Sequence, residues 1–104
     1  MSARRTLPES RSPAQPGEVL LEECIRPAGM TITEAADRMK ISRVRLSELV
    51  NGSRGMTPDS ALRVARLFGT DPEIWLNLQT RYDLWHAWRS ADAEEIGAIE
   101  PVGQ

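Results

Sequence analysis

Two arginines near the middle of the chain, Arg43 and Arg45, stand one residue apart behind a serine that can begin a helix. A guanidinium group can donate two parallel hydrogen bonds to O6 and N7 of a guanine, which is the commonest base-specific contact to DNA. In a helix beginning after Ser42, both arginines face outward within the first turns. The residues expected to contact bases are Ser42, Arg43, Val44, Arg45 and Ser47, with Val44 meeting a thymine methyl group.

Two short helices joined by a tight turn, between Thr31 and Gly52, must position these side chains. Thr31 and Glu34 have the spacing of a capping box, which predicts a helix over 32–39. Ser42 begins the second helix, expected over 43–50, and Gly52 ends it. Lys40 lies in the turn, where a positive φ is expected at a cost of about 1 kcal/mol for a residue other than glycine. This layout is a helix-turn-helix, which places its second helix in the major groove.

Polar and basic residues around these helices are expected to hold the DNA backbone. Hydroxyls and free N–H groups at a helix N-terminus suit a phosphate, and basic groups in turns add positioning contacts. The residues expected to contact phosphates are Thr31, Thr33, Lys40, Ser53 and Arg54. The alternative is that the basic side chains are merely solvated, and for Lys40 it is as strong as the phosphate contact.

The rest of the chain also has sequence patterns that predict helices. Apolar spacing predicts a helix over 17–26, and the starts Thr57-Pro58 and Asp71-Pro72 predict helices over 58–68 and 72–90. No alternation typical of strands occurs. We therefore expect an all-α fold of five helices over 16–90, preceded by a flexible arm over 1–15 and followed by an acidic tail over 91–104.

The last long helix is apolar on more than one face and holds all three tryptophans. A helix that covers one small core needs a single apolar stripe. The surplus predicts a second buried surface, which is a homodimer interface or a partner site. We expect Tyr82, Trp85 and Trp88 to form the dimer interface; the alternative is that the tryptophans belong to the chain's own core, which is stronger for Trp75.

Charge is distributed unevenly along the chain. The net charge is −2, which by itself does not favour a nucleic-acid partner. Counting residues in the sequence, segment 31–66 holds seven Lys and Arg against four Asp and Glu, whereas segment 67–104 holds two against seven. The helix-turn-helix is therefore locally basic and the C-terminal third acidic. This asymmetry suits DNA at one end and a basic partner at the other, although the acidic tail could serve solubility alone.

Catalytic and metal-binding patterns are weak. Cys24 is the single cysteine and His86 the single histidine, so no disulfide, metal set or cofactor site is expected, and a reducing cytoplasm fits. No phosphate-binding loop or nucleophile with a base is recognisable. The N-terminus lacks the apolar stretch of a signal peptide, and no apolar run is long enough to span a membrane.

Several stretches carry a resemblance to a known family. Residues 36–39, Ser42, Leu46 and 51–52 resemble the lambda-repressor-like helix-turn-helix family. The flanks 54–63 and 68–79, with Tyr82-Asp83-Leu84-Trp85, look like HigA-type antitoxins over about residues 15–88. That resemblance implies an antitoxin that binds a HigB-type mRNA-cleaving toxin and represses its own operon as a homodimer on a palindromic operator. Ile32 departs from the family, which often has a phosphate-binding glutamine there.

Three other functions stay open on the sequence alone. A stand-alone transcriptional regulator would share the DNA site and lack a toxin partner. A protein-interaction module would have lost DNA binding, which Ile32 and the negative net charge favour. An enzyme is the weakest of the three. A short reading frame for a toxin beside this gene would separate an antitoxin from a stand-alone regulator.

Overall fold

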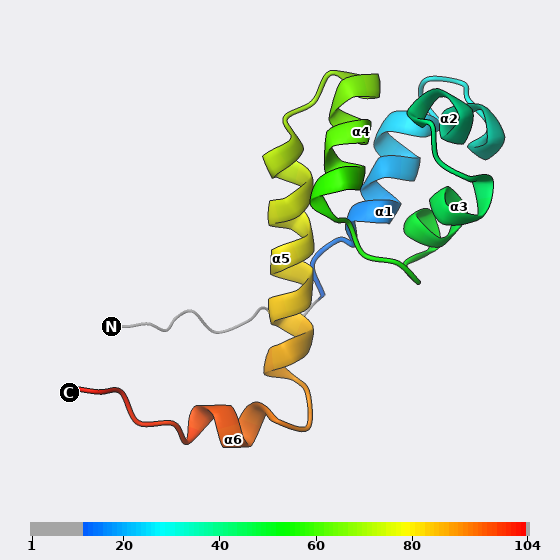
Figure 1. Cartoon of the computed structure of the whole chain (residues 1–104). Helices are drawn as coiled ribbons and strands as arrows, with labels where there is room; N and C mark the ends of the chain where they lie inside the picture. The colour runs from blue at the N-terminus through cyan, green and yellow to red at the C-terminus, as the bar shows by residue number, and fades with distance from the viewer. Residues whose placement is uncertain (1–11, 104) are drawn as a thin grey trace.

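The computed structural model describes residues 12–103, and every regular element within that range is helical. This agrees with the predicted all-α class. In chain order the elements are α1 (Pro16–Leu20), η1 (Leu21–Ile25), α2 (Ile32–Met39), α3 (Arg43–Asn51), α4 (Pro58–Phe68), α5 (Pro72–Trp88) and α6 (Ala93–Gly97). The helices α1 to α4 form a compact group, and α5 runs alongside α4 and then beyond the group (Figure 1).

The first helix contains a change of winding that the apolar spacing did not predict. α1 continues directly into η1, a turn of π-helix, so the element expected over 17–26 spans two segments. The side chain of Gln15 caps its start by accepting a hydrogen bond from the N–H of Glu18 at 3.1 Å. Of the arm expected over 1–15, residues 1–11 lie outside the described range.

Local capping explains where the helices of the helix-turn-helix begin and end. The hydroxyl of Thr31 accepts from the N–H of Glu34 at 3.0 Å, and the Glu34 carboxylate accepts from the N–H of Thr31 at 2.8 Å. Lys40 has the left-handed conformation expected in the turn, with φ 60° and ψ 42°. Gly52 ends α3 at φ 90°. The turn therefore holds α3 at a fixed angle to α2.

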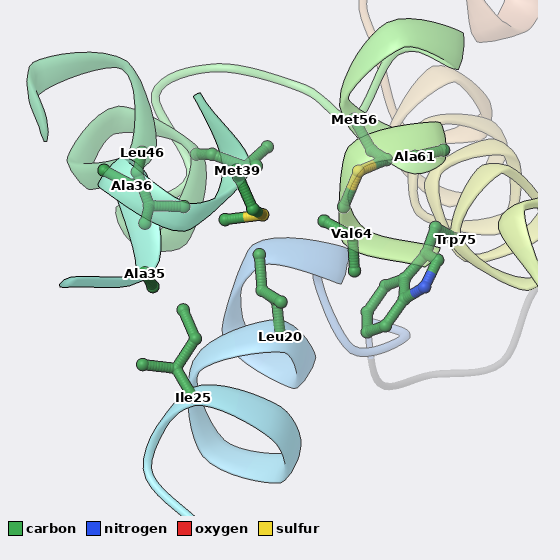
Figure 2. Packing of buried hydrophobic residues seen from close by; sticks show 11 residues of the cluster. Leu20, Ile25, Ala35, Ala36, Met39, Leu46, Met56, Ala61, Val64 and Trp75 are labelled. Carbon is green, nitrogen blue, oxygen red and sulfur yellow. The ribbon is translucent and has the colours of Figure 1, made fainter. Parts of the chain in front are cut away.

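The core lies between the N-terminal helix, the helix-turn-helix and α4. Its fully buried side chains include Leu20, Ile25, Leu46 and Val64, which Figure 2 labels, and also Leu49. Trp75 from the start of α5 closes one side of this core and is 3% exposed, while its Nε1 donates to the hydroxyl of Thr70 at 2.8 Å. Ile32 is also packed against the core, which explains why an apolar residue suits that position.

The C-terminal segment differs from the expected tail. α5 ends at Trp88 rather than at residue 90, and a separate short helix, α6, follows a turn and runs across the direction of α5 (Figure 1). Ile96, Ile99 and Val102 are exposed there. Within the described residues, no helix has the length and apolar character needed to cross a membrane.

Candidate nucleic-acid interface

The N-terminal half of α3 presents its side chains outward because its other face is anchored in the core. Leu46 and Leu49 are buried, and Ser42 caps the helix by accepting from the N–H of Arg45 at 3.0 Å. Arg43 and Val44 consequently lie on the exposed side, with Val44 63% exposed. An exposed apolar residue beside an exposed arginine suits the mixed surface of a major groove, with its guanine acceptors and thymine methyl groups.

Arg43 connects the two helices of the motif. Its Nε donates to the hydroxyl oxygen of Thr33 at 3.1 Å, so residues expected at a base and at a phosphate lie side by side. Thr31 is more constrained than expected, because its N–H and its hydroxyl oxygen both belong to the capping box. The Thr31 hydroxyl proton is the part of this residue left to donate to a phosphate oxygen.

Arg45 is held by a residue that the sequence pattern did not single out. Its Nη2 donates to Oδ2 of Asp59 at 2.6 Å, and the arginine side chain is 30% exposed. Nε of Arg63 donates to the same oxygen at 2.9 Å. The sequence pattern places Asp59 only at the acidic start of a helix. Its contact with Arg45 joins residues that are fourteen positions apart, and no local sequence pattern predicts such a contact.

The loop after α3 is ordered by hydrogen bonds of its own. The N–H and the hydroxyl of Ser53 both donate to Oδ1 of Asn51, the former at 3.0 Å. Arg54 folds back onto α3, where its Nη2 lies 2.8 Å from Oε1 of Glu48. Both expected phosphate contacts thus have intramolecular partners. The ammonium group of Lys40, in contrast, is exposed and has no ion-pair partner among residues 12–103.

Other reactive groups do not assemble a site. Burial, and secondarily the charge of Glu23, raise the pKa of the Cys24 thiol, which opposes thiolate chemistry. Over the residues that the structure describes, no three His, Cys, Asp or Glu side chains are grouped so as to hold a metal ion.

The aromatic residues expected at a dimer interface lie together on the part of α5 that extends beyond the helical group. His86 lies between Tyr82 and Trp85, with ring centroids 4.4 and 4.9 Å away. The guanidinium of Arg89 lies 3.8 Å from the ring centre of Trp85. Trp85 and Tyr82 are half-buried by these neighbours, whereas Trp88 is 45% exposed. This stretch therefore offers aromatic surface to a second molecule.

Stability should depend on pH through Asp59. Hydrogen bonds, first from Arg63 and then from Arg45, hold the pKa of its carboxyl below the ordinary value of 3.8. The Asp59 carboxyl therefore binds a proton more readily in the unfolded chain than in the folded one. Its contacts with the two arginines stabilise the fold above the ordinary pKa, and this stabilisation is lost as the pH falls through the lowered pKa. We expect the difference in unfolding free energy between wild type and Asp59→Asn to shrink below about pH 4, measured by urea denaturation. A difference that stays constant with pH would contradict this assignment.

Comparison with known proteins gives consistent matches. A family model described as helix-turn-helix, HTH_3, matches residues 21–75, more than half of the chain. The HTH-type transcriptional regulator YbaQ of Escherichia coli K12 is 38% identical over 96 residues, covering 91% of this chain and 85% of the relative. Antitoxin HigA-1 of Vibrio cholerae is 36% identical over 92 residues, covering 88% and 86%. The structure of Pseudomonas aeruginosa antitoxin HigA with the higBA promoter matches with a TM-score of 0.79 at 33% identity, covering 86% and 98%.

Proposed function

The chain belongs to the HTH_3 helix-turn-helix family and is similar to HigA-family antitoxins, and on that premise we propose that it is an antitoxin and autorepressor. It represses its own operon by binding a palindromic operator as a homodimer. It also neutralises a HigB-type mRNA-cleaving toxin by direct binding, in the cytoplasm. The family consists of DNA-binding regulators and antitoxins rather than enzymes.

The observation that carries the DNA-binding part is the exposed start of α3. Arg43 and Val44 project from a helix that its own buried leucines fix to the core. Because the core already holds α3 in place, contact with a base costs conformational entropy of the contacting side chains and little entropy of the backbone. Thr33 and Lys40 flank this surface and supply groups for phosphates. A relative, Pseudomonas aeruginosa antitoxin HigA, is described with promoter DNA, which supports DNA binding as a function of this chain.

The toxin-binding part is supported by similarity to an antitoxin and by the acidic C-terminal third of the chain. The described residues of that third include Asp92, Glu94, Glu95 and Glu100, all exposed. A small mRNA-cleaving toxin must bind a polyanion, so its surface is expected to be basic. Opposite charges on the two proteins would speed their association.

A stand-alone regulator is the second candidate, because YbaQ is described as an uncharacterized HTH-type transcriptional regulator. Expression of the neighbouring short reading frame, with and without this chain, separates the two functions. An antitoxin restores growth that the neighbour alone arrests, and it co-purifies with the neighbour. A neighbour that does not affect growth and does not bind the chain would leave the regulator as the function.

DNA binding is tested by a mobility shift with the DNA upstream of the chain's own reading frame, at two salt concentrations. Phosphate contacts release counterions, so we expect a shift at low salt that weakens at high salt. Unrelated DNA of equal length serves as the control and should bind more weakly. No shift at either salt concentration would remove DNA binding from the proposal.

Arg43 should contribute strongly to sequence discrimination. Arg43→Ala removes an exposed guanidinium that can form paired bonds with a guanine, worth about 1–3 kcal/mol of discrimination. We therefore expect affinity for the upstream DNA to fall about tenfold or more per half-site. Arg26→Ala is a suitable control, because Arg26 pairs with Glu22 on the N-terminal helix and should leave affinity unchanged. Equal affinities of the Arg43 variant and wild type would show that Arg43 does not contact the operator.

A further inference from the structure

The carboxylate of Asp59 joins three parts of the helix-turn-helix region. One oxygen accepts from Arg45 on α3 at 2.6 Å and from Arg63 on α4 at 2.9 Å. Nη1 of Arg63 also donates to the carbonyl oxygens of Met39 and Lys40, at 2.9 and 3.2 Å. A continuous chain of hydrogen bonds thus connects α4, the turn between α2 and α3, and the first turn of α3.

We propose that Asp59 is a positioning residue that sets the sequence specificity of DNA binding by holding Arg45 in place to contact a base. The inference rests on the proposed function, in which α3 enters the major groove. The partner is B-form DNA with a guanine at the position that faces Arg45. Asp59 itself acts through the arginine and does not need to touch the DNA.

The geometry leaves Arg45 able to contact a base while it is held. Only Nη2 is used by Asp59, and neither Nε nor Nη1 has a hydrogen-bond partner among residues 12–103. Nη2 carries two N–H donors, each parallel to an N–H of a neighbouring nitrogen, and Asp59 uses one of them. The second Nη2 N–H and the N–H parallel to it, on Nε or Nη1, therefore stay available as a pair for O6 and N7 of guanine. An arginine already held in one geometry loses less conformational freedom when it binds.

The negative charge of Asp59 also weakens the attraction to DNA phosphates, which is the same for every DNA sequence. Arg45 and Arg63 contribute two positive charges, and the carboxylate reduces their sum to one. A long-range attraction to phosphates is the same for every DNA sequence. Removing the carboxylate is therefore expected to strengthen binding to any DNA while it releases Arg45 from its fixed geometry. Loss of a purely structural contact would instead weaken binding to all sequences.

The test compares Asp59→Asn with wild type on the DNA upstream of the chain's reading frame and on a random-sequence duplex, at two salt concentrations. We expect the ratio of specific to non-specific affinity to fall about tenfold, the effect of losing one paired base contact. Non-specific affinity should rise and its dependence on salt should steepen. Asp59→Glu, which keeps the carboxylate, should retain most of the wild-type ratio and shows that the position tolerates substitution.

Glu48→Gln is the matched control, because Glu48 is also a carboxylate paired with an arginine, Arg54. It raises the local positive charge equally and leaves the contact between Asp59 and Arg45 intact, so the ratio should stay near wild type. In an Arg45→Ala background, Asp59→Asn should no longer change the ratio, because the residue that it positions is gone.

The outcomes separate this inference from the function on which it rests. If wild type does not prefer the upstream DNA, the proposed function is overturned and the inference with it. If wild type prefers that DNA and Asp59→Asn keeps the ratio, only the role of Asp59 is overturned. That role is also overturned if Glu48→Gln lowers the ratio as much, or if the effect of Asp59→Asn persists without Arg45.

Discussion

Gly17→Ala should destabilise the fold by about 3 kcal/mol, the upper end of the usual cost of overpacking a core. Gly17 is buried in the first turn of α1, where that helix crosses α3. A Cβ atom there would lie 1.7 Å from the carbonyl oxygen of Leu49 and 2.9 Å from the Cα atom of Val50. These neighbours are backbone atoms of α3, so no side-chain rotation relieves the overlap.

Two effects of this substitution oppose each other, and their sizes decide the result. Alanine favours a helix over glycine by about 1 kcal/mol, which would stabilise α1 if space allowed. The overlap with α3 instead forces the two helices apart and disturbs the packing of Leu20 and Leu49. Because the N-terminal helix sets the position of α3, we also expect DNA binding to weaken. Urea denaturation followed by circular dichroism measures the loss of stability.

Gly97→Ala provides the matched control. Gly97 lies in α6, and nothing lies within 4 Å of the Cβ that an alanine would add. There the helix preference acts alone, so stability should be unchanged or rise by less than about 1 kcal/mol. If Gly17→Ala is as stable as Gly97→Ala, the close approach of α1 to α3 does not describe the folded protein.

The features that the sequence predicted are those with local causes. The capping residues Thr31, Ser42 and Thr57 act within four residues of themselves, and they begin α2, α3 and α4 as expected. The left-handed turn at Lys40 follows from the spacing of the two helices that it joins. Such signals depend on the backbone near the residue, so the sequence alone can carry them.

The features that were missed depend on contacts between distant residues. Arg45 and Asp59 are fourteen residues apart, and Arg63 reaches a turn twenty-three residues before it. The local sequence around each of these residues does not predict that their side chains come into contact. The predicted interface therefore named α3 and missed the carboxylate that constrains one of the arginines of that helix. The separate helix α6 was missed because its few apolar residues have no partner in the chain's own core.

The double variant Trp85→Ala, Trp88→Ala should convert the proposed homodimer to a monomer. Leu84 and Trp88 are 55% and 45% exposed on the part of α5 that lies beyond the helical group. Buried tryptophans at interfaces typically cost about 2 kcal/mol or more each when they are truncated, and two-fold symmetry removes each contact twice. Equilibrium sedimentation should therefore give the mass of one chain for the variant and of two chains for wild type.

Loss of the dimer should weaken operator binding more than any single contact does. Two recognition helices related by a two-fold axis read half-sites about 34 Å apart, and a monomer holds only one of them. We expect affinity for a palindromic operator to fall about 100-fold or more, since the second half-site no longer binds as part of the same molecule. Affinity for a single half-site should stay near the wild-type monomer value, because the variant leaves α3 unchanged.

Ile74→Ala distinguishes this effect from a general loss of exposed apolar surface. Ile74 is 52% exposed at the opposite end of the same helix, so its truncation should leave the dimer intact. Circular dichroism reports whether each variant is folded, and in the double variant the fluorescence of Trp75, its one remaining tryptophan, reports it as well. A folded Trp85, Trp88 double variant that still sediments as a dimer would place the two-fold contact elsewhere. The aromatic surface of α5 would then be a candidate site for the proposed toxin. Co-purification of the double variant with the neighbouring gene product would test whether that surface binds the toxin.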